Sequence, residues 1–331
     1  MVTAAGLRIG WDDLPLPVRL AVEDILGDRV IDARSQVGGF SPGTADRVVT
    51  AAGQRAFVKA ASSGLNERTV ELHRREAAVA AALPAEVPAP QLRGVHDDGE
   101  WIALVFEDVG GRCPGTPWVA AEFAAAVSAL DRLAAVPVPA TLRRLLPDLG
   151  VMLADDLGGW RRIADDPPVG LDAWAVRHLD QLRDLGDRAA AALTGEGLVH
   201  ADIRADNLVV RADGAITIVD WPWASLGATW FDRLLLLVNV RCHGGQLSTD
   251  IDAEPDDITT VLAGIAGYFV DAARQPDIER CKRSRQPSPG GDMCGRKSSS
   301  ARGLSDFRRR VLRQTLVRSY SVVRPEPGPT P

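Results

Sequence analysis

Two apolar segments that border polar loops decide the fold of this chain. Residues 198–210 read LVHADIRADNLVV, and residues 216–221 read ITIVDW. Each holds short runs of Leu, Ile and Val, which predict β-strands beside polar loops. Because Asp202, Asn207 and Asp220 lie next to these strands, their side chains can converge at the strand ends.

These three side chains suit phosphoryl transfer. That reaction needs a carboxylate facing the incoming hydroxyl, and oxygen ligands for a Mg²⁺ ion that bridges the nucleotide phosphates. Asn207 is a neutral oxygen ligand, so it completes a metal shell without excess negative charge. Each residue taken alone is better explained as a cap or turn former, a common role of Asp. The spacing H-x-D-x₄-N, followed by an Asp after a second strand, favours the catalytic interpretation.

The segments HADIRADN (200–207) and IVDW (218–221) resemble the aminoglycoside phosphotransferase and small-molecule kinase family, which shares the protein-kinase-like fold. The resemblance implies an α+β, bilobal fold with a small β-rich N-terminal lobe and a larger helical C-terminal lobe. It also implies that Asp202 is the catalytic base or hydroxyl-orienting residue, and that Asn207 and Asp220 hold Mg²⁺.

Three further residues are connected with the catalytic loop. Arg204 stands where protein kinases often carry a phosphate-facing Lys, so it is the second catalytic candidate, with a solvated arginine as the alternative. Ala201 occupies a position where many relatives have Gly. The family resemblance makes Asp232 a buried brace behind the catalytic loop, and a helix-capping acid is the alternative.

Lysine is rare in this sequence, and one lysine lies in an apolar segment that predicts a role in phosphate binding. Of 38 basic residues only Lys59, Lys282 and Lys297 are lysines. Lys59 ends the apolar segment AFVKA, which resembles the VAIK-type strand whose lysine contacts the α- and β-phosphates. A compact ammonium on a thin stem fits between a strand and a phosphate where a guanidinium needs more room.

Glu76 is the expected partner of Lys59. The helix predicted over residues 66–83 carries an apolar stripe that includes Leu72, Glu76 and Val79, so the carboxylate faces the core. A carboxylate in that position is costly unless a cation meets it. The kinase resemblance supplies the same pair.

Two further segments are expected to contact the nucleotide. Gly38 and Gly39, in VGGFSPG, stand where kinases place the loop that covers the phosphates, although the G-x-G-x-x-G spacing is missing and a plain turn is the alternative. The resemblance makes the stretch from Glu107 to Val109 a linker between lobes whose backbone groups meet the adenine.

The remaining pattern supports two lobes and a tail. Hairpins are predicted over residues 45–60 and 91–108, with turn signals at Gly53 and Asp98-Gly99. Helices are predicted over four stretches: 119–136, 171–193, 230–240 and 257–273. We therefore expect an N-terminal nucleotide-binding lobe over 1–107, a helical catalytic and substrate lobe over 108–275, and a basic, flexible tail over 276–331.

Composition excludes several classes of protein. The 331 residues are 46% hydrophobic and 25% charged, values typical of a globular protein rather than of a disordered or coiled-coil chain. No apolar run is long enough for a membrane helix, and no secretory signal is visible at the N-terminus. Four cysteines without metal-ligand spacing favour a cytoplasmic protein.

The charge is uneven along the chain. Residues 280–331 carry 13 basic and 3 acidic residues, which leaves 25 basic and 41 acidic residues in the preceding body. An acidic body disfavours nucleic-acid binding and suits a cationic partner.

The sequence thus predicts a kinase that uses ATP and Mg²⁺ to phosphorylate a hydroxyl of a small molecule, with an aminoglycoside or another cationic compound as one substrate class. The alternatives are a metabolic kinase of the choline, homoserine or ketosamine type, and a catalytically weak pseudokinase-like binding protein.

Overall fold

The computed structural model of the chain describes residues 9–36 and 43–274. These residues form two compact units, one of residues 9–36, 43–148 and 195–251 and the other of residues 149–194 and 252–274. The first unit holds every strand of the described chain, whereas the regular elements of the second are all helices. This mixture confirms the expected α+β class. The lobe boundary after residue 107 stays a prediction, and the expected tail over 276–331 lies outside the described residues.

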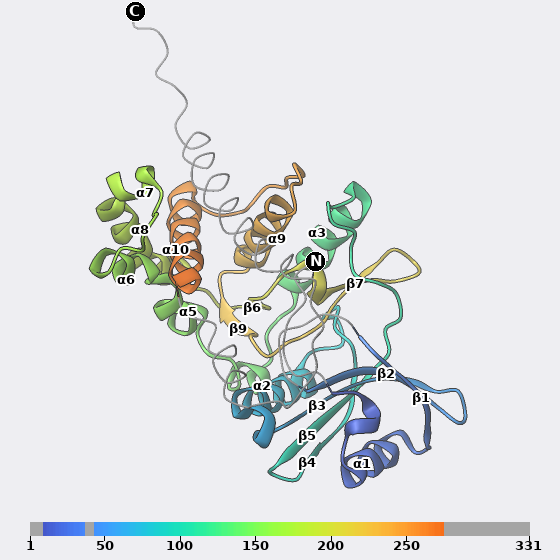
Figure 1. Cartoon of the computed structure of the whole chain (residues 1–331). Coiled ribbons are helices and arrows are strands. Elements are labelled where there is room, and N and C mark those ends of the chain that lie inside the picture. The colour runs from blue at the N-terminus through green and yellow to red at the C-terminus, as the bar shows by residue number, and fades with distance from the viewer. Residues whose placement is uncertain (1–8, 37–42, 275–331) are drawn as a thin grey trace, which may run out of the picture. The chain divides into compact units, whose positions relative to one another are not determined.

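The first unit contains an antiparallel five-stranded sheet (Figure 1). Both predicted hairpins are confirmed within it, and the glycines at their turns, Gly53 and Gly99, have the positive φ angles that such turns favour. In sheet order the strands are β1 (Val30–Ser35), β2 (Thr44–Thr50), β3 (Arg55–Ser62), β5 (Trp101–Glu107) and β4 (Leu92–Asp97).

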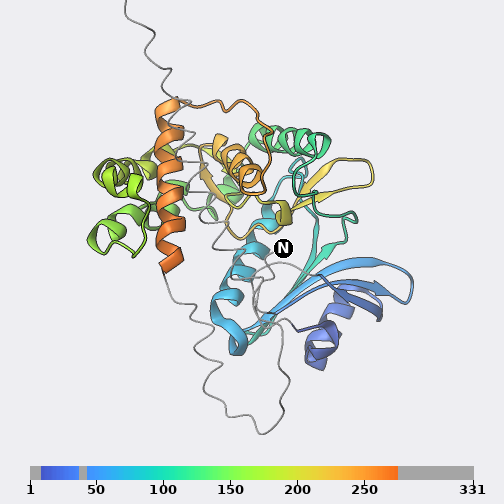
Figure 2. The ribbon, with the colours of Figure 1, turned by 45° about the horizontal axis from the view of Figure 1, so that its top comes forward.

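Two helices cover opposite faces of this sheet, α1 (Leu16–Leu26) and α2 (Ser63–Ala82) (Figures 1 and 2). Residues of β3 alternate between them because side chains alternate across a strand. Val58 packs in the cluster that contains the buried side of α1, whereas Ala61 packs in the cluster that contains Val70 of α2. Lys59 therefore lies on the α2 side of the sheet.

The backbone of α2 is interrupted near its start. Asn66 has φ −167° and ψ 110°, and its side-chain oxygen accepts the backbone N–H of Thr69 at 2.9 Å. Asn66 is thus an N-cap, which agrees with the helix start expected from the sequence. Later in α2, Glu76 is buried, as the apolar stripe predicted.

The rest of the first unit mixes helices with short strand pairs. Strand β6 pairs with β9, and β7 pairs with β8, both antiparallel. The predicted helices over 119–136 and 230–240 correspond to α3 and α9. The elements in order are α3 (Ala120–Ala135), α4 (Ala140–Arg143), β6 (Gly197–Val199), the 3₁₀ turn η2 (Ala205–Asn207), β7 (Leu208–Val210), β8 (Ile216–Ile218), β9 (Ser225–Gly227) and α9 (Trp230–Cys242). A 3₁₀ turn, η1 (Trp11–Asp13), precedes α1.

The second unit consists of four helices from residues 149–194 and one helix from residues 252–274. Trp160 is fully buried, and its indole N–H donates to the backbone carbonyl of Ala263 at 2.7 Å. The single helix predicted over 171–193 is wrong in detail, because the chain leaves helical geometry at His178 and forms two helices. The elements are α5 (Leu149–Leu157), α6 (Gly159–Asp165), α7 (Ala173–Arg177), α8 (Leu179–Ala192) and α10 (Pro255–Arg274).

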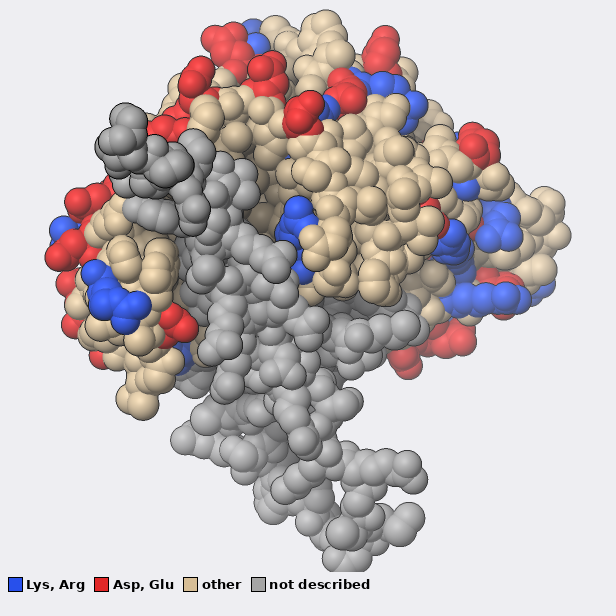
Figure 3. Space-filling model, turned by 90° about the horizontal axis from the view of Figure 1, so that it is seen from above, with Lys and Arg blue, Asp and Glu red and all other residues tan. Residues whose placement is uncertain are grey.

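In Figure 3, acidic and basic side chains lie side by side around the edge of the described surface, and the central part of that surface is mostly uncharged. Exposed ion pairs such as Arg161–Asp187 and Arg188–Asp256 join opposite charges on neighbouring elements. No helix among the described residues is long and apolar enough to cross a membrane.

Candidate active site

The β7–β8 hairpin brings two of the predicted site residues together. Leu208 pairs with Ile218, so Asn207 directly precedes one strand and Asp220 follows the other at the same end of the hairpin. The backbone N–H of Val219 donates to the carbonyl of Asn207 at 2.9 Å. The convergence expected from the sequence is therefore present in the structure.

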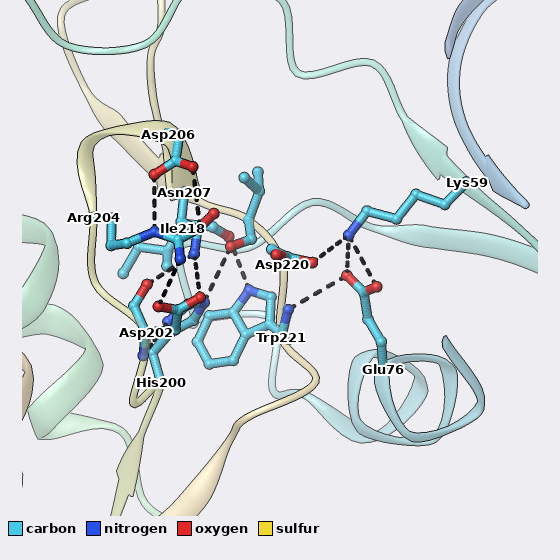
Figure 4. Close-up of polar contacts among 11 residues, drawn as sticks. Lys59, Glu76, His200, Asp202, Arg204, Asp206, Asn207, Ile218, Asp220 and Trp221 are labelled. Carbon is cyan, nitrogen blue, oxygen red and sulfur yellow. Dashed lines mark hydrogen bonds and ion pairs between the residues drawn. The ribbon is translucent and has the colours of Figure 1, made fainter. Parts of the chain in front are cut away.

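Lys59 joins this hairpin to helix α2. Its Nζ lies 2.7 and 2.9 Å from the two carboxylate oxygens of Glu76 and 2.7 Å from Oδ1 of Asp220 (Figure 4). Glu76 also accepts the backbone N–H of Trp221 at 3.3 Å. The structure thus contains the predicted Lys59–Glu76 ion pair and adds Asp220 to it.

Burial and charge act in opposite directions on these three groups. Burial disfavours the charged form of Lys59, but Asp220 and Glu76 outweigh it and raise the pKa of the ammonium. Burial raises the pKa of Glu76, and Lys59 opposes that rise. Asp220 is also desolvated, yet Lys59 lowers the pKa of its carboxyl to about 2. Lys59 and Asp220 are consequently charged at neutral pH.

Asp202 lies in the loop between β6 and η2, beside Asn207. Asn207 donates its side-chain Nδ2 to the backbone carbonyl of Asp202 at 2.8 Å and to Oδ2 of Asp202 at 2.9 Å. Burial raises the pKa of the Asp202 carboxyl to about 6, against the opposing charge of Arg204. A carboxyl with this pKa is ionised at neutral pH and can still accept a proton.

Arg204 bridges two carboxylates of the same loop. Its guanidinium donates two hydrogen bonds of 3.0 Å to Asp206, and Nη1 lies 3.4 Å from Oδ1 of Asp202 (Figure 4). The sequence analysis missed Asp206, although its place two residues after Arg204 was the available signal. Arg204 is therefore held in place rather than freely solvated.

Asp232 lies directly behind this loop. Its fully enclosed carboxylate accepts the backbone N–H of His200 at 2.7 Å and that of Ala201 at 2.9 Å. His200 is buried too, and its Nε2 lies 3.1 Å from the carbonyl of Val219. The two hydrogen bonds that Asp232 accepts from the loop backbone fit the bracing role that the resemblance implies for it.

The loop backbone is strained at Ala201, which has φ 65°. A residue with a β-carbon pays roughly 1–2 kcal/mol in this left-handed region, whereas glycine does not. We expect Ala201→Gly to raise the free energy of unfolding by about 1 kcal/mol, measured by urea denaturation. As a control, Ala124→Gly on the exposed face of α3 should lower it by about 1 kcal/mol. Destabilisation by Ala201→Gly would contradict this account.

The predicted linker residues follow strand β5. Glu107 ends the strand, and its backbone N–H donates to Gln91 at 2.9 Å. Within the described residues, no acceptor takes the backbone N–H of Val109. Gly38 and Gly39 lie outside the described residues.

The oxygen atoms of Asn207 and Asp220 are too few to enclose a metal ion by themselves, but they fit Mg²⁺ bound together with a nucleotide. No group of three or more His, Cys, Asp or Glu residues gathers to hold a metal in the described part of the chain. Asn207 uses its Nδ2 for Asp202 and keeps its oxygen, and Asp220 adds carboxylate oxygens. Two such ligands suit Mg²⁺, because that ion keeps several waters and binds through one or two carboxylates together with substrate phosphates.

Comparison with known proteins agrees with this geometry. The model of the phosphotransferase enzyme family matches residues 38–269. The chain belongs to this family. No curated protein sequence matches the chain significantly.

Solved structures confirm the protein-kinase-like fold expected from the sequence. An aminoglycoside phosphotransferase from Alicyclobacillus acidocaldarius superposes with a TM-score of 0.53 at 13% identity, covering 88% of this chain and 91% of that chain. A spectinomycin phosphotransferase solved with ADP and spectinomycin has a TM-score of 0.55 at 11% identity, covering 92% and 98%. A choline kinase from Streptococcus pneumoniae has a TM-score of 0.56 at 12% identity, covering 90% and 98%.

Proposed function

We propose that this phosphotransferase is a kinase that uses ATP and Mg²⁺ to phosphorylate a hydroxyl group of a small molecule. The observation that carries the proposal is the joined arrangement of Lys59, Glu76 and Asp220 beside Asp202 and Asn207. It provides a cation for phosphate oxygens, oxygen ligands for a metal and a carboxylate for the acceptor.

Each residue has a defined part in the reaction. Lys59 binds phosphate oxygens, and Glu76 holds its ammonium in position. Asn207 and Asp220 would hold Mg²⁺, which supplies positive charge near the phosphate oxygens when it is bound. Asp202 orients the acceptor hydroxyl and takes its proton as the hydroxyl oxygen bonds to the γ-phosphorus and the bond to the ADP oxygen breaks. Arg204 adds positive charge beside that phosphoryl group, so catalysis rests on positioning and charge.

Two substrate classes deserve testing. A cationic amino sugar fits the acidic body of the chain, and two of the structural neighbours are aminoglycoside and spectinomycin phosphotransferases. An amino alcohol is the second class, because a choline kinase is equally similar in fold. The presence of every polar group needed for transfer argues against a pseudokinase-like binding protein.

The test is ATP turnover by the purified full-length chain with Mg²⁺, first alone and then with a panel of aminoglycosides and amino alcohols. Phosphorylated product is identified by mass spectrometry and ³¹P NMR. We expect acceptor-dependent formation of a phosphate monoester. A chain that binds ATP but phosphorylates no member of the panel would favour the pseudokinase-like alternative.

The raised pKa of Asp202 predicts the pH dependence of this activity. As pH falls through about 6, the carboxylate gains a proton and can no longer accept one from the hydroxyl, so kcat/KM should fall with a midpoint near that value. Arg204 stabilises the charged form of Asp202, and its removal in Arg204→Gln should move the midpoint to higher pH. An unchanged midpoint in Arg204→Gln would argue against Asp202 as the titrating group.

A further inference from the structure

Asp108, between the two linker residues expected to meet the nucleotide, has an enclosed and fully partnered carboxylate. Its side chain is only 2% exposed. Oδ2 accepts a hydrogen bond from Nε of Arg55 at 2.9 Å and forms an ion pair with Nη2 of Arg55 at 2.8 Å. Oδ1 accepts the backbone N–H of Gly110 at 3.0 Å and lies 3.4 Å from Nε of Arg47. The carboxylate thus ties strands β2 and β3 to the linker.

The linker is held at further points after Asp108. Arg47 also donates from Nη2 to the backbone carbonyl of Gly111 at 3.2 Å. The next residue, Arg112, exchanges two backbone hydrogen bonds with Val210 of β7, at 3.2 and 2.7 Å. Side chains of the sheet and the backbone of the β7–β8 hairpin therefore fix the path of the chain from 108 to 112.

This arrangement leaves backbone donors of the linker unused. Among the described residues, the backbone N–H groups of Asp108, Val109 and Gly111 have no acceptor. The N–H of Val109 lies between two positions that are tied down, Asp108 by its side chain and Gly110 by its backbone. A donor held on a fixed backbone loses little conformational freedom on binding, which favours affinity. The Asp108 carboxylate is itself too enclosed to touch a ligand.

We propose that Asp108 is a positioning residue for the nucleotide base: it holds the linker so that the backbone N–H of Val109 is preorganised for hydrogen bonding to the base. The inference rests on the proposed function, since it needs a nucleotide whose base lies at this linker. It concerns the base alone, because in the described structure the phosphate-side residues Lys59 and Asp220 form no hydrogen bond or ion pair with Asp108, Arg47 or Arg55.

Asp108→Asn tests the inference, since the amide keeps the size of the side chain and an acceptor for Gly110 but loses the charge that both arginines contact. Isothermal titration calorimetry with Mg²⁺ measures binding of ATP and of inorganic tripolyphosphate, which has phosphates and no base. We expect the Kd for ATP to rise about tenfold, as for the loss of one or two hydrogen bonds. The Kd for tripolyphosphate should stay within about twofold, and kcat at saturating ATP should be retained while KM for ATP rises.

Asp97→Asn is a matched control. Asp97 accepts two hydrogen bonds from Arg74, at 2.8 and 2.9 Å, and one from the backbone N–H of Gly99 at 3.0 Å. Asp97 therefore pairs with an arginine and a backbone N–H as Asp108 does, but it lies at the end of β4, away from the linker. In Asp97→Asn, the ratio of the Kd for ATP to the Kd for tripolyphosphate should equal that of the wild type.

Arg55→Gln provides a second variant if Asp108→Asn folds poorly, because the Arg55 side chain is 59% exposed and its loss leaves no cavity. Arg55→Gln should also raise the Kd for ATP while leaving the Kd for tripolyphosphate nearly unchanged. Equal weakening of ATP and tripolyphosphate in either folded variant, or no weakening, overturns the inference. A wild-type chain that binds no ATP would instead overturn the proposed function, and this inference with it.

Discussion

Asp202→Asn is expected to reduce kcat by about 10²- to 10⁴-fold, the range typical of a lost general base. The amide cannot take a proton from the acceptor hydroxyl, yet its oxygen can still accept the side-chain hydrogen bond that Asn207 donates at 2.9 Å. The loop should therefore keep its path, and the Kd for ATP should stay within about twofold. Steady-state kinetics with the acceptor found in the panel, together with calorimetric ATP binding, measures both quantities.

Asp213→Asn is the control for that variant. Asp213 lies in the turn between β7 and β8, where it accepts the backbone N–H of Ala215 at 3.0 Å, and its side chain is 64% exposed. Its activity should equal that of the wild type. Retention of more than about a tenth of the wild-type kcat by Asp202→Asn would contradict the role proposed for Asp202.

Local sequence signals predicted much of the fold because they are strong where the elements are regular. The β2–β3 and β4–β5 hairpins were predicted from alternating apolar residues and from Gly53 and Gly99 at their turns. The helix over 66–83 was predicted from its sequence pattern, and the structure confirms its start at the Asn66 cap and the burial of Glu76.

Elements that depend on tertiary packing were not predicted. Helix α1 is short, and its buried residues Val18, Val22 and Leu26 form a narrow stripe that becomes meaningful only against the outer face of the sheet. Strand β1 has an exposed Ile31, so its pattern does not alternate cleanly. The break at His178 follows a helix-rich stretch without Gly or Pro, and nothing in the local sequence marks it.

The candidate site shows the same distinction between local and long-range information. Asp202, Asn207 and Asp220 were found because their spacing is fixed along the chain. Asp108 was missed although it lies beside two linker residues that were singled out. Its partners Arg47 and Arg55 come from strands far away in sequence, and the pairing of β2 with β3 decides where their side chains reach.

Lys59→Met is expected to affect both activity and stability. The thioether side chain fills nearly the same volume but carries no charge, so kcat/KM for ATP should fall by about 10²- to 10³-fold, as for a lost charge-stabilising donor. Glu76 would be left buried without its cation, at a cost of roughly 3–5 kcal/mol in the free energy of unfolding. Urea denaturation and steady-state kinetics measure the two effects separately.

The double variant Lys59→Met/Glu76→Gln separates the two roles of the lysine. Glutamine removes the buried charge and can still accept the backbone N–H of Trp221, so most of the lost free energy of unfolding should return. Activity should not return, because no cation is left for the phosphates. If the double variant recovered activity along with stability, Lys59 would be a structural partner of Glu76 and not a phosphate-binding residue. If it recovered neither, the buried charge of Glu76 would not be the source of the instability, and Asp220, which Lys59 also contacts at 2.7 Å, would become the group that needs the cation.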